Sequence, residues 1–401
     1  MICDEGERGT TVVPFGSPLY VMAKPAGAAC NLRCGYCYYL EKSQLYPESG
    51  AHVMSDAVLE DFVRQYLEAQ TQPEVLFTWH GGEPLLRPIS FYERALRLQR
   101  QYSRGHYIDN CLQTNGTLLT DDWCRFFRDH HFLIGISIDG PQSLHDSYRL
   151  TRGGEPTWQQ VMKGIRLLEQ YAVEWNAMAT VNRLNAAHPQ QFYRFFRDMG
   201  CQYLQFTPVV ERSADGSIAD YSVTPRQWGE FLCAVYDEWV QRDVGSIFVQ
   251  TFDATLANWA GVAPGVCSLS TMCGHSLALE WNGDVFFCDH YVFPQYRLGN
   301  IRRHSLTALS ASHAQQQFRR MKTVLLPRQC RECQWLFACH GECPKNRFCA
   351  DRYGNPGLNY LCSGYQQFFA HVAPGMDFMK AELDAGRSPA NIMSMASAEI
   401  Y

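Results

Sequence analysis

The sequence lacks the features that mark membrane proteins and nucleic-acid-binding proteins. No segment approaches the roughly 20 apolar residues of a membrane-spanning helix. The net charge is −5, and no basic run or polybasic tail is present, which argues against a nucleic-acid partner. The N-terminal segment "MICDEGERGT" is acidic and has no apolar stretch, so it does not resemble a secretory signal. We therefore expect a cytoplasmic protein without a membrane span.

Internal repeats and low-complexity segments are also missing, and the composition is that of a folded protein. The chain has 401 residues, of which 46% are hydrophobic and 19% charged. This length allows two domains, or one large domain with an appendage.

Cysteine, by contrast, is abundant and unevenly placed. The chain has seventeen cysteines, an odd number without a signal sequence, which favours metal ligation in a reducing compartment over disulfides. Nine lie between Cys267 and Cys362, and eight precede Cys267. The uneven distribution predicts a first domain with one metal site and a second, cysteine-rich domain.

The first part of the chain alternates strand-like and helix-like segments. We count six strand–helix units, beginning with the strand pattern over 19–25 and closed by a helix over 226–241. The other predicted helices include one that Ser55 caps and three over 121–129, 158–171 and 190–199. Such alternation indicates parallel strands with right-handed crossovers. Because six units fall short of the eight in a full barrel, a partial open barrel and a doubly wound sheet both fit.

Beyond Gly261 the helical periodicity fades. The stretch "LALEWNGDVFFCDHY" predicts a hairpin with Asn282 and Gly283 in its turn. A further helix is expected near 365–372, followed after Pro374 by a peripheral helix with a loose end.

Polar loops follow most of the predicted strands. "HGGEP" follows the second strand, "QTNG" the third, "SIDGP" the fourth and "TPVVER" the sixth. Each loop alone could be ordinary turn chemistry. Together with a cysteine motif after the first strand, they predict a ligand site at the C-terminal ends of the strands.

That motif is "AACNLRCGYC", which places Cys30, Cys34 and Cys37 at the spacing C-x3-C-x2-C. Zinc is the first alternative, but a tetrahedral zinc site needs a fourth ligand that no neighbouring residue offers. A [4Fe–4S] cluster held by three thiolates leaves one iron open to bind a substrate or cofactor.

A second motif, "CRECQWLFACHGECP", contains Cys330, Cys333, Cys339 and Cys343. It resembles the ferredoxin run C-x2-C-x2-C-x3-C-P, in which the last cysteine ligates a different cluster from the first three. The further ligands would come from Cys267, Cys273, Cys288, Cys349 and Cys362. Buried structural thiols are the expected role of Cys3, Cys111, Cys124, Cys201 and Cys233, and of Cys349 if it is not a ligand.

Taken together, these motifs resemble the radical S-adenosylmethionine (SAM) superfamily, and the cysteine-rich half resembles its SPASM auxiliary-cluster domain. More narrowly, "KPAGAACNLRCGYCYYLEK", "WHGGEP", "LQTNGTL", "GISIDGP" and "FFCDHYVFPQYRLGN" are similar to the anaerobic sulfatase-maturating enzymes. The resemblance covers about 18–365. It implies a partial (β/α)6 barrel over 15–255, a SPASM domain over 256–375 and a tail over 376–401.

The resemblance also implies cofactors and their ligands. SAM and three [4Fe–4S] clusters are expected. Cys30, Cys34 and Cys37 would hold the SAM-cleaving cluster, Cys267, Cys273, Cys288 and Cys343 the nearer auxiliary cluster, and Cys330, Cys333, Cys339 and Cys362 the farther one. SAM would contact Tyr36, Gly81, Gly82, Glu83, Ser137, Arg149 and Val210. Glu83 has an alternative role as a helix-capping carboxylate, and His80 departs from the glutamine of some members.

The implied activity is oxidation of a cysteine or serine in a sulfatase polypeptide, within a C/S-x-P-x-R-type motif, to Cα-formylglycine. Asp289 matches the family's base, and its alternative is an ordinary turn aspartate. An electron donor such as flavodoxin or ferredoxin is expected. Two rivals are another SPASM peptide-modifying enzyme that forms crosslinks and a non-catalytic iron–sulfur electron carrier. The sequence leaves open whether the substrate residue is cysteine or serine.

Overall fold

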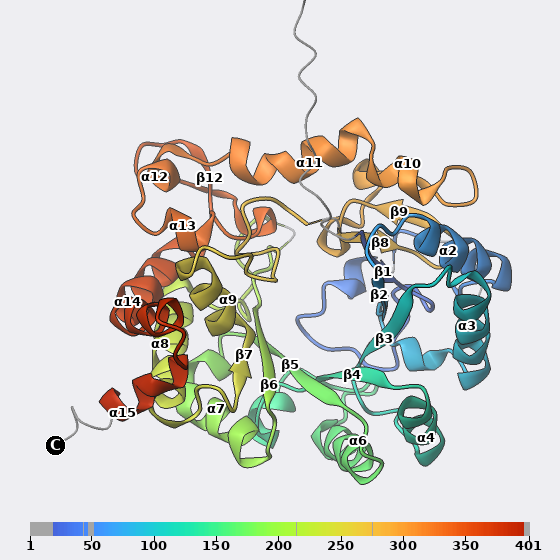
Figure 1. Ribbon diagram of the computed structural model, residues 1–401, viewed down its shortest axis with the longest axis horizontal. Coiled ribbons are helices and arrows are strands. Elements are labelled where there is room, and N and C mark those ends of the chain that lie inside the picture. Colours follow the sequence, from blue (N-terminus) through green and yellow to red (C-terminus); the bar gives the residue numbers. More distant parts are fainter. Residues whose placement is uncertain (1–18, 43, 47–51, 214, 275, 397–401) are drawn as a thin grey trace, which may run out of the picture.

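The computed structural model describes residues 19–42, 44–46, 52–213, 215–274 and 276–396. Its centre is a ten-stranded sheet with the order β10-β9-β8-β1-β2-β3-β4-β5-β6-β7. Figure 1 shows this sheet curving, with the helices of the first part of the chain on its outer side. Within the described residues, no helix combines the length and apolarity needed to cross a membrane.

Six parallel strands and their connecting helices form the first part. The strands are β1 (Tyr20–Ala23), β2 (Glu74–Trp79), β3 (Tyr107–Thr114), β4 (Phe132–Ser137), β5 (Trp175–Val181) and β6 (Tyr203–Pro208), each parallel to the next. The helices are α1 (Tyr39–Lys42), α2 (Asp56–Glu68), η1 (Pro84–Leu86), α3 (Ile89–Tyr102), α4 (Asp121–Asp129), α5 (Gln142–His145), α6 (Trp158–Gln170), η2 (Asn185–Ala187), α7 (Pro189–Asp198) and α8 (Pro225–Arg242). The predicted partial (β/α)6 barrel is confirmed, and the doubly wound sheet is not formed.

Helix α2 illustrates why these segments fold as they do. The Ser55 side chain accepts a hydrogen bond from the Val58 amide, as its predicted role as an N-cap requires. Phe62 and Tyr66 lie one turn apart and are fully buried against the sheet. Burial of one such side chain contributes roughly 1.5–3 kcal/mol.

The cysteine-rich part continues the same sheet. Its first elements are β7 (Phe248–Val249), α9 (Gln250–Trp259), β8 (Ser276–Leu279), β9 (Asp284–Phe286), η3 (Asp289–Tyr291), η4 (Pro294–Tyr296) and β10 (Arg297–Asn300). Strand β8 pairs in parallel with β1, and β8 and β9 form the predicted hairpin with Gly283 at a φ of 89° in its turn. Strand β1 is therefore hydrogen-bonded on both edges.

The remaining elements are coloured orange to red in Figure 1. They are α10 (Leu306–Ser310), α11 (His313–Val324), α12 (Arg328–Arg331), α13 (Leu336–Cys339), η5 (Pro344–Asn346), β11 (Cys349–Ala350), β12 (Pro356–Leu358), α14 (Cys362–Asp384), η6 (Pro389–Asn391) and α15 (Ile392–Ala396). They run from α10 beside α2 to α13 beside α9, and α14 and α15 then pack along α8. The helix expected near 365–372 is longer than predicted, because α14 continues through Pro374. Buried Met376 and Met379 extend its apolar face along α8, and this burial offsets the hydrogen bond that proline cannot donate.

Candidate active site and cysteine sites

The three cysteines of the first motif lie in the loop between β1 and α1. The Cys37 amide donates to the Cys34 carbonyl at 3.1 Å, and the Leu32 amide donates to the Cys30 sulfur at 3.3 Å. Burial raises the pKa of the Cys30 and Cys34 thiols to about 11, with further contributions from neighbouring cysteines of the same motif. A buried set of thiols that disfavour one another's ionisation is suited to a cationic metal centre, which stabilises thiolates.

Glu83 and Asn115 support this loop from the neighbouring strands. The Glu83 carboxylate accepts hydrogen bonds from the Leu85 amide at 2.9 Å, from Thr114 Oγ1 at 2.8 Å and from the Asn115 amide at 2.8 Å. Asn115 Nδ2 in turn lies 3.6 Å from the Cys30 sulfur. The bond to Leu85 caps η1, so the capping alternative for Glu83 describes its observed contacts.

Gly81 and Gly82 allow the loop after β2 to pack closely against the loop between β1 and α1, which carries the first cysteine motif. The Gly82 amide donates to the Gly27 carbonyl at 2.9 Å. A Cβ atom on Gly82 would lie 2.1 Å from the Ala29 carbonyl oxygen, and Gly81 has a φ of 110°. Any side chain at Gly82 would therefore displace the cysteine loop.

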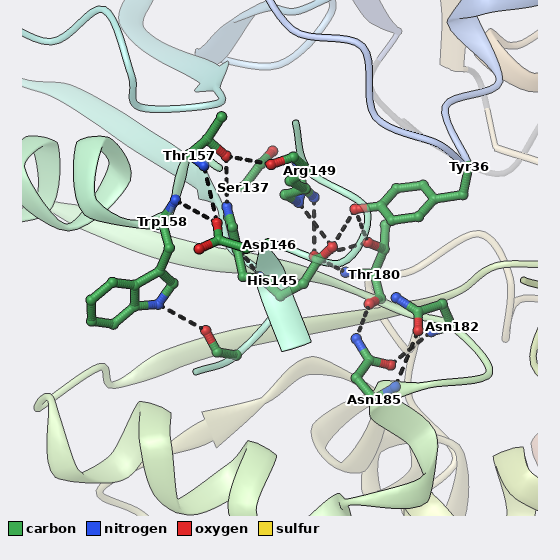
Figure 2. A network of polar contacts seen from close by, with 12 residues as sticks. Tyr36, Ser137, His145, Asp146, Arg149, Thr157, Trp158, Thr180, Asn182 and Asn185 are labelled. Carbon is green, nitrogen blue, oxygen red and sulfur yellow. Dashed lines mark hydrogen bonds and ion pairs between the residues drawn. The ribbon is translucent and has the colours of Figure 1, made fainter. Parts of the chain in front are cut away.

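Tyr36 and Arg149 meet at the carboxylate of Asp139, which follows β4 and is buried. Figure 2 shows the Tyr36 and Arg149 side chains approaching each other in this network. Arg149 Nε lies 2.9 Å from Asp139 Oδ2, and the Tyr36 hydroxyl donates to the same oxygen. The Thr180 amide donates to Asp139 Oδ1 at 2.9 Å. Burial opposes ionisation of Asp139, but Arg149 outweighs it, and the pKa of this carboxyl is lowered. Asp139 thus links the loops after β1 and β4 with strand β5.

Two further residues expected at the SAM site lie at strand ends around this network. Ser137, the last residue of β4, accepts a hydrogen bond from Gln113 Nε2 at 3.0 Å. Val210 follows β6 and is buried. All the predicted SAM-contacting residues are therefore placed in loops or strand ends at the C-terminal side of the parallel strands.

Asp289 begins η3, directly after Cys288, and its partners come from the barrel. Tyr39 donates its hydroxyl to Asp289 Oδ2 at 2.8 Å, and Tyr38 donates to the same oxygen. Lys24 Nζ forms an ion pair with Asp289 Oδ1 at 2.5 Å. Burial opposes ionisation, yet Lys24 and other neighbouring cations outweigh it, and the pKa of Asp289 lies well below its usual range.

The surroundings of Asp289 include Lys42 and His80. Lys42 Nζ donates to the Asp289 backbone carbonyl. His80 Nδ1 accepts the Gly81 amide at 2.7 Å and lies 3.3 Å from the Tyr39 hydroxyl. Since the Gly81 amide donates to Nδ1, the ring proton of a neutral His80 is on Nε2. An ordinary turn aspartate would have local partners, whereas these come from segments about 250 positions earlier.

Four cysteines gather next to Asp289 in the cysteine-rich part. Burial raises the pKa of Cys343, and the nearby Cys288 and Cys267 raise it further. Cys273 and Cys267 likewise act on Cys288, whose pKa burial raises to about 12. The buried Lys322 ammonium donates to the Cys267 carbonyl at 2.5 Å and opposes these shifts for Cys267 and Cys273.

Another four cysteines line one cavity between α12, α13 and the start of α14. They are Cys330, Cys333, Cys339 and Cys362, and the wall is completed by residues that include Trp335, Tyr365 and Phe369. Burial raises the pKa of the Cys362 thiol to about 12, with Cys330 and Cys333 contributing. Four thiols around an otherwise largely apolar cavity fit the donor chemistry of an iron–sulfur cluster.

The chain separates Cys339 from Cys343 by an unusual turn. His340, Gly341 and Glu342 have φ values of 47°, 72° and 53°, so three consecutive residues are left-handed. The Arg347 guanidinium donates to all three carbonyls, at 2.8 Å for His340, 2.7 Å for Gly341 and 3.0 Å for Glu342. This reversal directs the two cysteines into different groups.

Of the other described cysteines, Cys124, Cys201 and Cys233 are buried as expected for structural thiols, whereas Cys111 and Cys349 are only partly buried. Cys111 lies on β3, Cys124 on α4, Cys233 on α8 and Cys349 on β11, while Cys201 precedes β6. Cys3 lies outside the described residues.

Several residues of the site escaped the sequence analysis. Lys24, Tyr38, Tyr39, Lys42, Asp139 and Glu280 were not singled out, although each belongs to the contacts of a predicted site residue or its partners. A lysine directly after an apolar strand, and paired tyrosines directly after a cysteine motif, are the signals that could have drawn attention to them.

Two family models match the chain. The radical SAM superfamily model matches residues 25–196, and the iron–sulfur cluster-binding SPASM model matches residues 267–334. The fold and its cysteine sites therefore define a radical SAM enzyme that carries an iron–sulfur-binding domain and uses SAM and a [4Fe–4S] cluster.

Individual relatives narrow the class. The chain is 56% identical to a serine-type anaerobic sulfatase-maturating enzyme of Bacteroides thetaiotaomicron, over 96% of this chain and 97% of that protein. It is 31% identical to a cysteine-type anaerobic sulfatase-maturating enzyme of Clostridium perfringens, over 89% of this chain and 97% of that protein. A solved structure of native anSMEcpe with bound AdoMet and the Cp18Cys peptide superposes with a TM-score of 0.81 at 29% identity, covering 91% of this chain and 99% of that chain. The chain belongs to the anaerobic sulfatase-maturating enzymes.

Proposed function

We propose that this enzyme oxidises a serine of a sulfatase polypeptide to Cα-formylglycine, with Asp289 as the proton acceptor. The observation that carries the proposal is the position of Asp289. Asp289 directly follows Cys288, one of the four cysteines that gather next to it. Its carboxylate is held by Lys24, Tyr38 and Tyr39, which come from the segment that carries the first cysteine motif. Radical chemistry and proton transfer could then act on one substrate carbon and its neighbouring oxygen.

Eleven cysteines are proposed as ligands of three [4Fe–4S] clusters. They are Cys30, Cys34 and Cys37 for the SAM-binding cluster, Cys267, Cys273, Cys288 and Cys343 for the nearer auxiliary cluster, and Cys330, Cys333, Cys339 and Cys362 for the farther one. When bound, these groups and SAM supply the radical that removes a β-hydrogen and the acceptor for the second electron. The division into a barrel over 15–255, an auxiliary domain over 256–375 and a tail over 376–401 belongs to the same proposal.

The chain's own residues bind SAM and move one proton. Tyr36, Gly81, Gly82, Glu83, Ser137, Arg149 and Val210 are proposed to hold SAM beside the first cluster. Converting the serine CH2–OH to an aldehyde removes one hydrogen atom, one proton and one electron, and Asp289 accepts the proton. The Tyr38 and Tyr39 hydroxyls keep the carboxylate oriented by donating to Oδ2.

We propose serine rather than cysteine as the substrate residue because the serine-type relatives have the higher sequence identity to this chain. Besides the enzyme at 56% identity, a serine-type enzyme of Klebsiella aerogenes is 38% identical over 88% of this chain and 85% of that protein. The cysteine-type enzyme of Clostridium perfringens is 31% identical. We also propose a C/S-x-P-x-R-type motif in the substrate and a flavodoxin or ferredoxin as the electron donor.

Paired peptides test the proposal. The reconstituted enzyme is incubated anaerobically with SAM, a chemical reductant and either an S-x-P-x-R or a C-x-P-x-R peptide of otherwise identical sequence. Mass spectrometry is expected to show formylglycine from the serine peptide, with turnover at least as fast as from the cysteine peptide. A crosslinked product, or formylglycine from cysteine alone, would contradict the proposal.

A further inference from the structure

Lys24 is a lysine whose side chain is completely removed from solvent. It follows β1 directly and has an exposed fraction of 0%. A buried ammonium is costly unless anionic partners compensate its lost hydration. Its surroundings therefore indicate what this charge is for.

Two carboxylates flank the ammonium. Lys24 Nζ lies 2.9 Å from Glu280 Oε1 and 2.5 Å from Asp289 Oδ1. Glu280 is buried, follows β8 and accepts the Gly283 amide at its own carbonyl, so it is fixed by the hairpin turn. Burial opposes protonation of Lys24, but Asp289 and Glu280 outweigh it and raise its pKa.

The stem of Lys24 contacts the loop expected to bind SAM. A Cβ atom built on Gly81 would lie 3.2 Å from Lys24 Cβ and 3.3 Å from Lys24 Cγ. The Lys24 backbone amide also donates to the Leu279 carbonyl at 2.9 Å, which places it between β1 and β8. One residue thus touches the glycine loop, the hairpin turn and Asp289.

The two oxygens of Asp289 have different partners. Oδ2 receives the Tyr38 and Tyr39 hydroxyls, whereas Oδ1 is paired with the Lys24 ammonium. Without Lys24, Asp289 and Glu280 would lose the cation between them, and Lys42, which donates to the Asp289 backbone carbonyl, would remain as a cation that acts on Asp289. The carboxylate would then rotate or shift toward Lys42.

We propose that Lys24 is a positioning residue that fixes the Asp289 carboxylate relative to the Gly81–Gly82 loop, with Glu280 as the residue that fixes Lys24. This inference rests on the proposed role of Asp289 as proton acceptor. Lys24 acts on the reaction through Asp289, because its buried ammonium pairs with the carboxylates of Asp289 and Glu280. A displacement of about 1 Å in such a group lowers the rate by about a hundredfold.

The test uses the reconstituted, cluster-loaded enzyme and the variants Lys24→Met, Lys24→Arg and Glu280→Gln. Iron content and visible absorption are measured first, then 5′-deoxyadenosine release without peptide, then formylglycine per 5′-deoxyadenosine with the serine peptide. Arg387→Met is the control. It also replaces a cationic side chain by methionine, but the Arg387 guanidinium pairs with Glu382 at the end of α14, away from the site.

Lys24→Met is expected to keep its iron and its 5′-deoxyadenosine release within about twofold, while formylglycine per 5′-deoxyadenosine falls about a hundredfold. Lys24→Arg is expected to restore part of this ratio, since a guanidinium can still bridge two carboxylates. Glu280→Gln is expected to lower the ratio less than Lys24→Met. The control is expected to match the parent enzyme.

A double variant distinguishes a role of Lys24 that acts through Asp289 from a role that is independent of Asp289. If Lys24 acts through Asp289, adding Lys24→Met to Asp289→Asn lowers formylglycine formation no further. Multiplied losses in the double variant, or an unchanged ratio in both Lys24→Met and Glu280→Gln, would overturn the inference. Loss of iron in Lys24→Met with a normal ratio in Glu280→Gln would assign Lys24 a structural role. Normal product formation by Asp289→Asn alone would instead refute the proposed base.

Discussion

Cys339 and Cys343 are separated by three residues, yet they belong to different groups of cysteines. Cys339 lines a cavity with Cys330, Cys333 and Cys362, whereas Cys343 lies under the electrostatic influence of Cys288 and Cys267. Three left-handed residues make the reversal, and the Arg347 guanidinium holds their carbonyls. The turn therefore holds the two cysteine groups at a short, fixed separation.

This relationship predicts which pairs of substitutions act on one cluster. Cys343→Ala and Cys288→Ala should each lose about four irons per chain, and the double variant should lose no more than either alone. Combining Cys343→Ala with Cys339→Ala should lose about eight. Iron and sulfide assays after anaerobic reconstitution provide the measurement. Equal losses from the two double variants would contradict the assignment.

The first cysteine motif makes a separate prediction. The parent enzyme should contain about twelve irons per chain, and a variant with Cys30, Cys34 and Cys37 replaced by alanine about eight. The same variant should release no 5′-deoxyadenosine, because the cluster with the open iron is missing. SAM cleavage at the parental rate would show that another site binds SAM.

Asp289→Asn should separate radical formation from product formation. The amide preserves the shape of the side chain but cannot accept a proton, so formylglycine formation should fall at least about a hundredfold. Iron content and 5′-deoxyadenosine release should stay near the parental values. Loss of an auxiliary cluster in this variant would point to a structural role next to Cys288.

Gly82→Ala should abolish SAM cleavage. The added Cβ atom would lie 2.1 Å from the Ala29 carbonyl, so the cysteine loop or the glycine loop must move. Gly153→Ala is the control, because its Cβ would lie 3.7 Å from Thr151 Oγ1, an ordinary contact. We expect 5′-deoxyadenosine release to fall more than about a hundredfold for Gly82→Ala, given the cost of displaced reacting groups, and to stay unchanged for the control.

A pH-dependent stability effect is expected at Asp253 on α9. Burial raises the pKa of this carboxyl from 3.8 to about 6. The folded state therefore keeps the proton between about pH 4 and 6 while the unfolded state releases it, so stability falls as the pH rises through this window and stays lower above it. Asp253→Asn removes this penalty, which partial exposure limits to about 1–2 kcal/mol.

Thermal unfolding of the cluster-loaded enzyme at pH 7.5 and pH 5 checks this expectation, these being roughly one and a half units above and one unit below the raised pKa. Asp253→Asn should raise the melting temperature more at the higher pH. Asp109→Asn, at an exposed position on β3, is the matched control and should change neither value. An equal gain at both pH values would mean that the amide stabilises through packing.

The local signals of the sequence led to the right elements. Alternating segments predicted the six parallel strands, Ser55 caps α2 as expected, and Asn282–Gly283 forms the predicted turn. These features depend on residues that are near one another in the chain, where periodicity and turn chemistry are informative.

Features that depend on distant segments were not accessible in the same way. The ion pair of Lys24 with Asp289 requires that β1 and β8 lie side by side, and nothing within either segment specifies that pairing. The length of α14 was underestimated because Pro374 reads as a helix terminator, whereas packing on α8 decides the outcome. In the sequence, Asp139 has the features of an ordinary turn residue. Its role emerges only in the structure, where Tyr36 and Arg149 contact its carboxylate.

The pairing of β1 with β8 has a consequence for biosynthesis. Residues 20–23 emerge early from the ribosome, but their partners at 276–279 follow more than half the chain later. One edge of the strand that leads into the first cysteine motif must therefore wait unpaired during translation. Contacts of such long sequence separation form slowly, and unpaired strand edges invite aggregation. Completion of the sheet is thus a late event. Iron delivered to the first motif before β8 has been made would meet a loop whose preceding strand, β1, is unpaired on one edge.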